Sequence, residues 1–250
     1  MYLEVAVDPI VPRMNMTDAV AARAVLYTGG ISVGSNRFLS YFLRTYSHLF
    51  DGEPVSFDPP ENPDGDQIQI LIQNAAGNLQ LCAFPKRIEL RELPSESTPI
   101  NIEAHMTLAE RLLNGYRAFL PLGTAHVECS VLWLSPDDDS ARTISRYFCQ
   151  ERWVTGPLDG VAAYQFLARK FVTLGGRIEV DSWLRCMSHL ISDMTSPPIA
   201  SPPAIFFDQS FKTYGPELAP DQIVDFFRLA PEELTRVLRG FFPPAEGAVP

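Results

Sequence analysis

Three carboxylates in the C-terminal half have the residue types needed for metal-assisted hydrolysis. Glu179, Asp181 and Asp208 lie in stretches where apolar and polar residues alternate, which is typical of β-strands. If these strands are neighbours, the carboxylates meet on one face and could hold Mg²⁺ for a nuclease or another hydrolase. Alternating strands of an acidic protein also bring carboxylates together by chance. We therefore rank a metal-dependent hydrolase below a non-catalytic role.

Ser32 is a second candidate for catalysis. The sequence Gly30-Ile-Ser-Val-Gly34 matches the Gly-x-Ser-x-Gly pattern, in which a tight turn after a buried strand exposes a nucleophilic serine. However, residues 21–27 make a poor buried strand, and the sheet has antiparallel character. We interpret Ser32 as a turn residue and rank a serine hydrolase last.

The same loop has the glycine spacing of a phosphate-binding loop. Gly29 and Gly34 are separated as in the P-loop motif, but Ser35 and Asn36 occupy the positions of its lysine and its hydroxyl residue. Without that lysine, the motif lacks the charge that neutralises the β- and γ-phosphates. We predict that this loop binds neither ATP nor GTP, and that the protein uses no cofactor.

Histidines and cysteines are isolated in the sequence. No two of them have the spacing of a metal site (His48, His105, His126, His189, Cys82, Cys129, Cys149 and Cys186). His126 alternates with Glu128 on one face of a predicted strand and could form half of a general acid–base pair, although a single exposed strand histidine is more common. We predict no metal site, and cysteines that act as small buried apolar residues rather than as disulfides.

The elements that position these residues begin with a meander between Asp66 and Leu93. Apolar and polar residues alternate through three consecutive stretches; Ile68, Ile70 and Ile72, for example, face one side while glutamines face the other. Pro85 ends the second stretch because it cannot donate to a strand ladder. The pattern predicts antiparallel strands with one solvated face.

Further strands and helices are predicted on both sides of the meander. Strands are expected at 2–7, 125–134 and 204–211. Apolar stripes indicate helices at 37–50 and 107–120, and a short helix is predicted over 19–26. Prolines at the first helical position predict one helix that starts near 136 and two more over 220–229 and 231–242.

Residues 161–174 fit two interpretations. They read either as a helix that ends at Gly175-Gly176, or as a strand whose glycine pair turns the chain into a second strand at 177–184. We favour the hairpin, because residues 177–184 have the pattern of a strand. The predicted fold class is α+β: a mostly antiparallel sheet of five to eight strands, with helices chiefly on one face.

Composition sets the class of protein and its domain organisation. We predict one domain over 1–250, with a possible subdivision near 51–66, a proline-rich connector at 196–203 and a frayed tail at 243–250. The net charge of −10 disfavours nucleic-acid binding unless cations gather on one face. No apolar run reaches the ~20 residues of a membrane span, and the N-terminus lacks signal-peptide features, so we expect a cytoplasmic protein.

From the meander to the C-terminal helices, the chain resembles a sporadically distributed, uncharacterised family of bacterial proteins of about this length. The similar segments are 77–84, 109–134 and 204–211, and Asp208 matches an aspartate that the family tends to carry in its last strand. The family's Arg-Tyr-x-Asn-like sequence is replaced here by Val131-Leu-Trp-Leu134. The resemblance covers about the C-terminal two thirds and implies no activity. Mobile-element and phage-defence neighbourhoods, where such proteins occur, imply a binding or regulatory role.

We predict a non-enzymatic protein that acts through a protein partner or self-association. Phe226-Phe227 and Phe241-Phe242 are adjacent pairs, and neighbours on a helix point about 100° apart. One buried helix face therefore covers both members of each pair with difficulty. Burial within the fold is the favoured outcome, because large exposed apolar patches are rare on monomers. The alternative is a partner-binding surface that contains Phe227 and Phe242.

Overall fold

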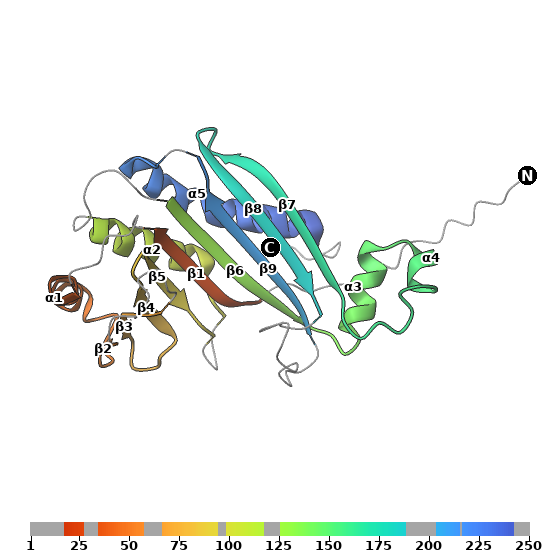
Figure 1. Cartoon of the computed structure of the whole chain (residues 1–250), viewed down its shortest axis with the longest axis horizontal. Coiled ribbons are helices and arrows are strands. Elements are labelled where there is room, and N and C mark those ends of the chain that lie inside the picture. Colours follow the sequence, from red (N-terminus) through yellow and green to blue (C-terminus); the bar gives the residue numbers. More distant parts are fainter. Residues whose placement is uncertain are drawn as a thin grey trace, which may run out of the picture.

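In the part of the chain that the structure describes, nine strands form one antiparallel sheet (Figure 1). The computed structural model describes residues 18–27, 35–57, 67–94, 99–117, 126–188, 204–215 and 217–242. The strand order is β2-β3-β4-β5-β1-β6-β9-β8-β7. The strands are β1 (Asp18–Tyr27), β2 (Val55–Ser56), β3 (Ile70–Gln73), β4 (Leu79–Ala83), β5 (Arg87–Glu92), β6 (His126–Pro136), β7 (Gln165–Leu174), β8 (Ile178–Met187) and β9 (Ala204–Thr213). The predicted α+β class is confirmed, with one strand more than the predicted range.

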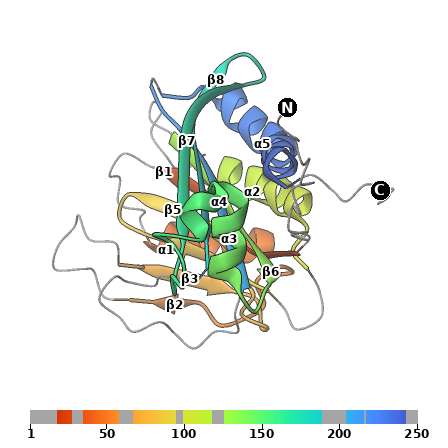
Figure 2. The ribbon, with the colours of Figure 1, turned by 90° about the vertical axis from the view of Figure 1, so that its right-hand side faces the viewer.

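Helices cover one face of this sheet. Within the described ranges they are α1 (Ser35–Tyr46), α2 (Ile102–Arg117), α3 (Ser140–Phe148), α4 (Glu151–Val154) and α5 (Pro220–Phe241). Figure 2 shows α2 and α5 on the same side of the sheet, with α3 and α4 near one end of it. The helices that the described residues form are all too short or too polar to cross a membrane.

The core lies between the sheet and α2 and α5. Alternate strand residues point into it, including Leu26, Val131 and Phe207, which are fully buried. They meet Leu112 of α2 and Phe226 of α5, which are also fully buried. Each such side chain contributes roughly 1.5–3 kcal/mol through the area that it removes from water. The sheet therefore has an inner face toward the helices and an outer face on the opposite side.

The helix predicted over 19–26 is wrong, because these residues form most of β1. Ala22, Ala24 and Leu26 point to the inner face and are at most 2% exposed, while Arg23 and Tyr27 alternate with them. β1 lies between β5 and β6 in the middle of the sheet. Alanine has the highest helix propensity, but the two neighbouring ladders and the burial of one face outweigh that local preference.

The hairpin interpretation of residues 161–184 is confirmed, and the second strand extends to Met187. β7 and β8 pair antiparallel from Gln165↔Met187 to Leu174↔Ile178. Gly175 and Gly176 have φ angles of +54° and +73°, and the Arg177 N–H donates to the Leu174 carbonyl at 3.1 Å. Only glycine adopts positive φ at two consecutive positions without steric cost, so this pair sets the turn.

The two C-terminal helices that the prolines predicted are one continuous helix. α5 runs from Pro220 through Pro231 to Phe241. A proline inside a helix removes one backbone hydrogen bond and usually bends or breaks it. Here buried residues lie on both sides of Pro231, such as Phe227 before it and Leu234 after it. Their packing on the sheet holds the helix together across the proline.

The bounds of three further helices differ from the prediction. The helix predicted over 37–50 is α1, Ser35–Tyr46. α2 begins at Ile102, where the Asn101 side chain accepts a hydrogen bond from the Ala104 N–H at 3.0 Å and caps the helix. The helix expected near Pro136 begins at Ser140, because β6 continues through Pro136 beside β9. The predicted strand at 2–7, Ser32 with its glycine loop at 28–34, His189, the connector at 196–203 and the tail at 243–250 lie outside the described residues.

Candidate functional site

Charged and aromatic side chains line the outer face of the sheet. Alternation along each strand places them opposite the core residues, on the side away from α2 and α5. They come from five neighbouring strands, β5, β1, β6, β9 and β8, and from edge strand β7. The outer-face residues used below are Arg23, Tyr27, Arg87, Glu89, Arg91, Glu128, Arg169, Phe171, Glu179, Asp181, Trp183, Arg185, Asp208 and Lys212.

Glu89 is the centre of the first group of charges. Its side chain is fully buried, and arginines from two strands surround it. Arg87 Nε donates to Glu89 Oε1 at 2.6 Å, Arg91 Nε donates to Oε2 at 2.7 Å, and Arg23 Nη1 lies 3.8 Å from Oε1. A buried carboxylate needs such partners, because leaving it unpaired would cost several kcal/mol.

Glu128 is the centre of the second group. Arg23 forms an ion pair with one of its oxygens, and the Tyr27 hydroxyl donates to the other at 2.6 Å. Burial and the hydrogen bond to Glu128 raise the pKa of Tyr27 well above its usual range. Arg23 thus joins both carboxylates, since it reaches Glu89 on one side and Glu128 on the other.

The three carboxylates proposed for a metal site are on the outer face but do not converge. Asp181 on β8 is opposite Lys212 on β9, whereas Asp208 is opposite Arg185. Asp208 and Lys212 are four residues apart on one strand, which corresponds to ~13 Å. Glu179 is exposed. Across the described part of the chain, no group of three or more His, Cys, Asp or Glu side chains could hold a metal ion.

Asp181 and Asp208 have opposite electrostatic settings. Arg169 donates to both oxygens of Asp181, from Nε and Nη2 at 2.8 Å each, and these hydrogen bonds lower the pKa of Asp181. Burial raises the pKa of Asp208, and the charge of Arg185 opposes that shift. An arginine therefore engages Asp181, and desolvation favours the neutral form of Asp208.

Three buried cysteines, Cys82, Cys129 and Cys186, are not set up as nucleophiles. Burial raises the pKa of Cys82 to about 11 and that of Cys186 to about 12, and it raises the pKa of Cys129 further. A thiol must ionise to react, so these three are unreactive near neutral pH. All four cysteines are free, as expected for small apolar residues.

Phe227 and Phe242, the residues proposed for partner binding, are 1% and 7% exposed. Phe227 packs edge-on against Phe226, with ring centroids 5.2 Å apart. The Phe242 ring lies 4.8 Å from Phe207 of β9 and 5.4 Å from Tyr147 of α3. Both rings belong to the core of this chain, which matches the favoured interpretation of the aromatic pairs.

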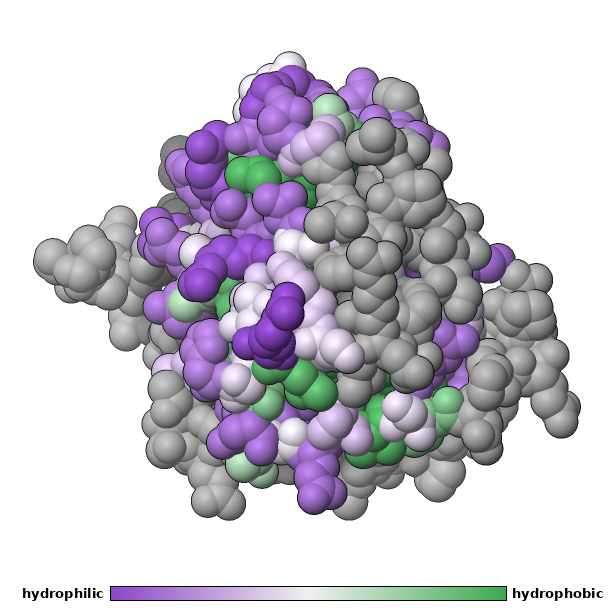
Figure 3. All heavy atoms as spheres, turned by 90° about the vertical axis from the view of Figure 1, so that its left-hand side faces the viewer, coloured by the Kyte–Doolittle hydropathy of each residue, from purple (hydrophilic) through white to green (hydrophobic). Residues whose placement is uncertain are grey.

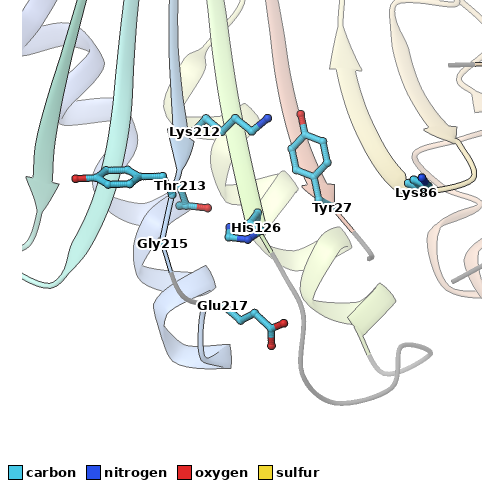
Figure 4. A pocket seen from close by; sticks show the side chains of 8 residues that line it. Tyr27, Lys86, His126, Lys212, Thr213, Gly215 and Glu217 are labelled. Atoms are coloured by element: carbon cyan, nitrogen blue, oxygen red, sulfur yellow. The ribbon is translucent and has the colours of Figure 1, made fainter. Parts of the chain in front are cut away.

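A cavity of about 530 Å³ opens at one end of the sheet. Tyr27 at the end of β1, His126 at the start of β6, and Lys212 and Thr213 at the end of β9 line it, and Lys86 reaches it from the β4–β5 turn (Figure 4). The Lys212 ammonium lies 4.6 Å from the centre of the Tyr27 ring, a cation–π contact. The cavity therefore combines cations with an aromatic wall.

The two edges of the sheet differ in length and exposure. β2 has two residues, and with Phe57 it exposes a short apolar segment; Val55 is 39% exposed and Phe57 43%. Figure 3 looks onto this end of the molecule and shows mostly hydrophilic side chains, with apolar ones in small separate areas. β7 has ten residues, and Leu167 and Phe171 are 48% and 57% exposed.

Comparison with known proteins adds no assignment. No protein-family model matches the chain, and no curated protein matches it.

Sequence reasoning found His126, Glu128, Asp181 and Asp208 but did not identify the groups in which they lie. Arg23 and Tyr27 were missed because residues 19–26 were assigned to a helix. Once β1 is a strand, Tyr27 is opposite His126 and Val25 is opposite Glu128, which brings these side chains together. The alternation of Arg23, Val25 and Tyr27 with buried alanines was the available signal.

Proposed function

We propose that this chain is a non-enzymatic binding protein, and that its partner is another protein that adds an extended segment to β7. The observation that carries the proposal is a ten-residue edge strand with exposed apolar side chains. An edge strand presents a row of unpaired backbone groups, so natural proteins usually shorten or cover it. Strand addition at such an edge is a common mode of peptide recognition.

The backbone of β7 supports this mode. The Ser188 N–H donates to the Tyr164 carbonyl at 3.0 Å, directly after the last pair of the β7–β8 ladder, Gln165↔Met187. Hydrogen-bonded and non-hydrogen-bonded pairs alternate along antiparallel strands. The N–H and C=O groups of Leu167, Arg169 and Phe171 therefore point away from β8, toward the position of an added strand.

The side chains around this edge favour an acidic, apolar segment. The Phe171 ring lies 4.8 Å from that of Tyr214, and Tyr214 is 38% exposed. The guanidinium of Arg169 lies over the Trp183 ring at 4.7 Å and over Phe171 at 5.1 Å. Lys170, on the opposite side of β7, is exposed. Glutamates or aspartates of the partner would meet these cations, and β-branched residues would meet the aromatic rings.

The same cations oppose pairing of β7 with its copy in a second chain. The midpoint of β7 falls between Arg169 and Lys170. Because only the odd-numbered residues point their backbone groups away from β8, a symmetric antiparallel pair near this midpoint would place Arg169 opposite its own copy or Lys170 opposite its own copy. Like charges at opposed positions are destabilising. This repulsion favours a different protein over self-association. The mobile-element or phage-defence setting implied by the resemblance stays a prediction.

Peptide selection tests the proposal even while the partner is unidentified. Random ten-residue peptides on phage are selected against the full chain, and an enriched peptide is measured by fluorescence anisotropy. We expect enriched peptides to alternate acidic and β-branched residues. Phe171→Asp should weaken binding of such a peptide at least about tenfold, or ~1.4 kcal/mol. Trp153→Asp is the matched control, because Trp153 is 47% exposed on α4.

Two results would contradict strand addition at β7. One is equal weakening by Phe171→Asp and Trp153→Asp. The other is a wild-type chain that elutes as a dimer and becomes a monomer in Phe171→Asp, since β7 would then be the contact between two copies.

A further inference from the structure

The cavity beside Lys212 has an unusual charge for this protein. The chain has a net charge of −10 and three lysines, Lys86, Lys170 and Lys212. Two of the three, Lys86 and Lys212, line the cavity. Glu217 is the one carboxylate among the described lining residues, and Figure 4 places it at the opposite end of the group from Lys212. The described lining therefore carries more positive than negative charge, with Lys212 and Lys86 on opposite sides of Tyr27.

The carboxylates nearest to Lys212 are engaged by other residues. Lys212 is opposite Glu128 on β6 and opposite Asp181 on β8. Glu128 already accepts from Arg23 and Tyr27, and Asp181 is held by both donor nitrogens of Arg169. Lys212 itself forms no ion pair within 4.0 Å with any carboxylate that the structure describes. Its ammonium instead lies over the Tyr27 ring.

Among the other polar groups that line the cavity, two hydroxyls have partners and one histidine nitrogen does not. The Tyr27 hydroxyl is fixed by Glu128, and the Thr213 hydroxyl accepts from the Val127 N–H at 3.0 Å. His126 Nδ1 is buried and has no hydrogen-bond partner within the described residues. A buried polar atom without a partner is costly, and a ligand group that bonds to it removes that cost.

We propose that this cavity binds a small organic molecule that carries an oxyanion, either a phosphate or a carboxylate. Lys212 and Lys86 neutralise the oxyanion, His126 Nδ1 bonds to it, and the ring of Tyr214 contacts the body of the molecule. A volume of about 530 Å³ is within the range of small-molecule sites and exceeds what a bare phosphate fills. Tyr214 also contacts Phe171 of β7, so the cavity shares this residue with the edge proposed for strand addition, but binding in the cavity does not depend on an added strand.

Lysine footprinting on the wild-type chain tests the site directly. The chain is acetylated with an amine-reactive ester, and mass spectrometry follows Lys86, Lys170 and Lys212 separately. The probes are phenyl phosphate, benzoate and phenol, which share a ring and differ in charge. We expect at least one of the two anions to slow acetylation of Lys212 and Lys86 about threefold or more, and to leave Lys170 unchanged. Phenol should protect none of them.

Charge-removing variants give the second measurement. Lys212→Met should weaken calorimetric binding of the protective anion about tenfold, which corresponds to ~1.4 kcal/mol. Lys170→Met removes the same charge from an exposed residue of β7 that does not line the cavity, and it should leave the affinity unchanged. Protection by phenyl phosphate alone assigns a phosphate ligand, and protection by benzoate alone assigns a carboxylate. The proposal is overturned if neither anion protects Lys212 at about 10 mM, or if all three lysines are protected equally.

Discussion

Replacing Glu89 with glutamine tests the charge network on the outer face. Glu89→Gln keeps the size of the side chain and removes the negative charge that three arginines share. The carboxylate is fully buried, whereas the side chains of Arg87, Arg91 and Arg23 are 18%, 32% and 38% exposed. The variant therefore leaves three partly buried guanidinium groups around a neutral amide. We expect a large loss of stability.

The magnitude follows from the burial of the four groups. Two unit charges about 4 Å apart interact by about 4 kcal/mol at an effective dielectric constant of 20. Desolvation of the carboxylate offsets much of this gain, and removing one partner of a buried pair typically costs about 3–5 kcal/mol. The arginines reach water, which screens their charges, so we lower the expected cost to roughly 2–3 kcal/mol.

Urea unfolding of the wild type, Glu89→Gln and Glu233→Gln measures this difference. Glu233→Gln is the control, because it also removes one negative charge, here from an i,i+3 pair with Arg236, whose side chain is 64% exposed. Such pairs contribute about 0.2–0.5 kcal/mol. We expect Glu89→Gln to lower the free energy of unfolding by at least about 2 kcal/mol relative to the control. Values for the two variants that agree within about 0.5 kcal/mol would refute the network as a source of stability.

Two further predictions concern pH and the aromatic core. The pKa of Asp181 is lowered in the folded protein, so this residue stabilises the fold above about pH 4, and its contribution is lost as the pH falls through the folded-state pKa. The pKa of Asp208 is raised, so its contribution to stability is present below about pH 4 and is lost as the pH rises through its folded-state pKa. Urea unfolding at pH 3 and pH 7 should therefore show that Asp181→Asn destabilises only at the higher pH, whereas Asp208→Asn is neutral or stabilising there; changes of the same sign for both at pH 7 would contradict these assignments. Phe227→Ala should lower the free energy of unfolding by about 3–5 kcal/mol, and Phe171→Ala, at an exposed ring, by about 0.5 kcal/mol or less; a stable Phe227→Ala would place Phe227 outside the core.

The sheet was largely predictable because its signal is local. The meander, the β7–β8 hairpin and β9 all show the alternation of a half-buried strand, and Gly175-Gly176 marks the turn. The failures have a tertiary cause. β1 is rich in alanine and was assigned to a helix, but neighbours on both sides determine its conformation. Pro231 predicted a break, but core contacts on both sides of it hold α5 together.

The candidate site was harder to predict because it depends on register across strands distant in sequence. Asp181 and Asp208 alternate correctly, but the meeting of the three carboxylates requires a β8–β9 register that the sequence does not encode locally. The observed register places each aspartate opposite a cation instead, Lys212 for Asp181 and Arg185 for Asp208. Arg169 comes from the other neighbouring strand and completes the ion pair with Asp181. The result is a set of charge pairs rather than a carboxylate cluster.

The net charge of a chain does not predict whether one of its cavities can bind an anion. A charge of −10 describes the whole chain, and it led to the expectation that nucleic-acid binding is disfavoured unless cations gather on one face. Among the outer-face residues named above, five arginines and Lys212 outnumber the five carboxylates by one. Each of Glu89, Glu128 and Asp181 has an arginine partner. Because Glu128 and Asp181 are engaged by arginines, the ammonium of Lys212 contributes a local positive charge. An acidic protein can therefore contain a cavity suited to an anion, because potentials at short range follow the local pairing of charges and not their sum.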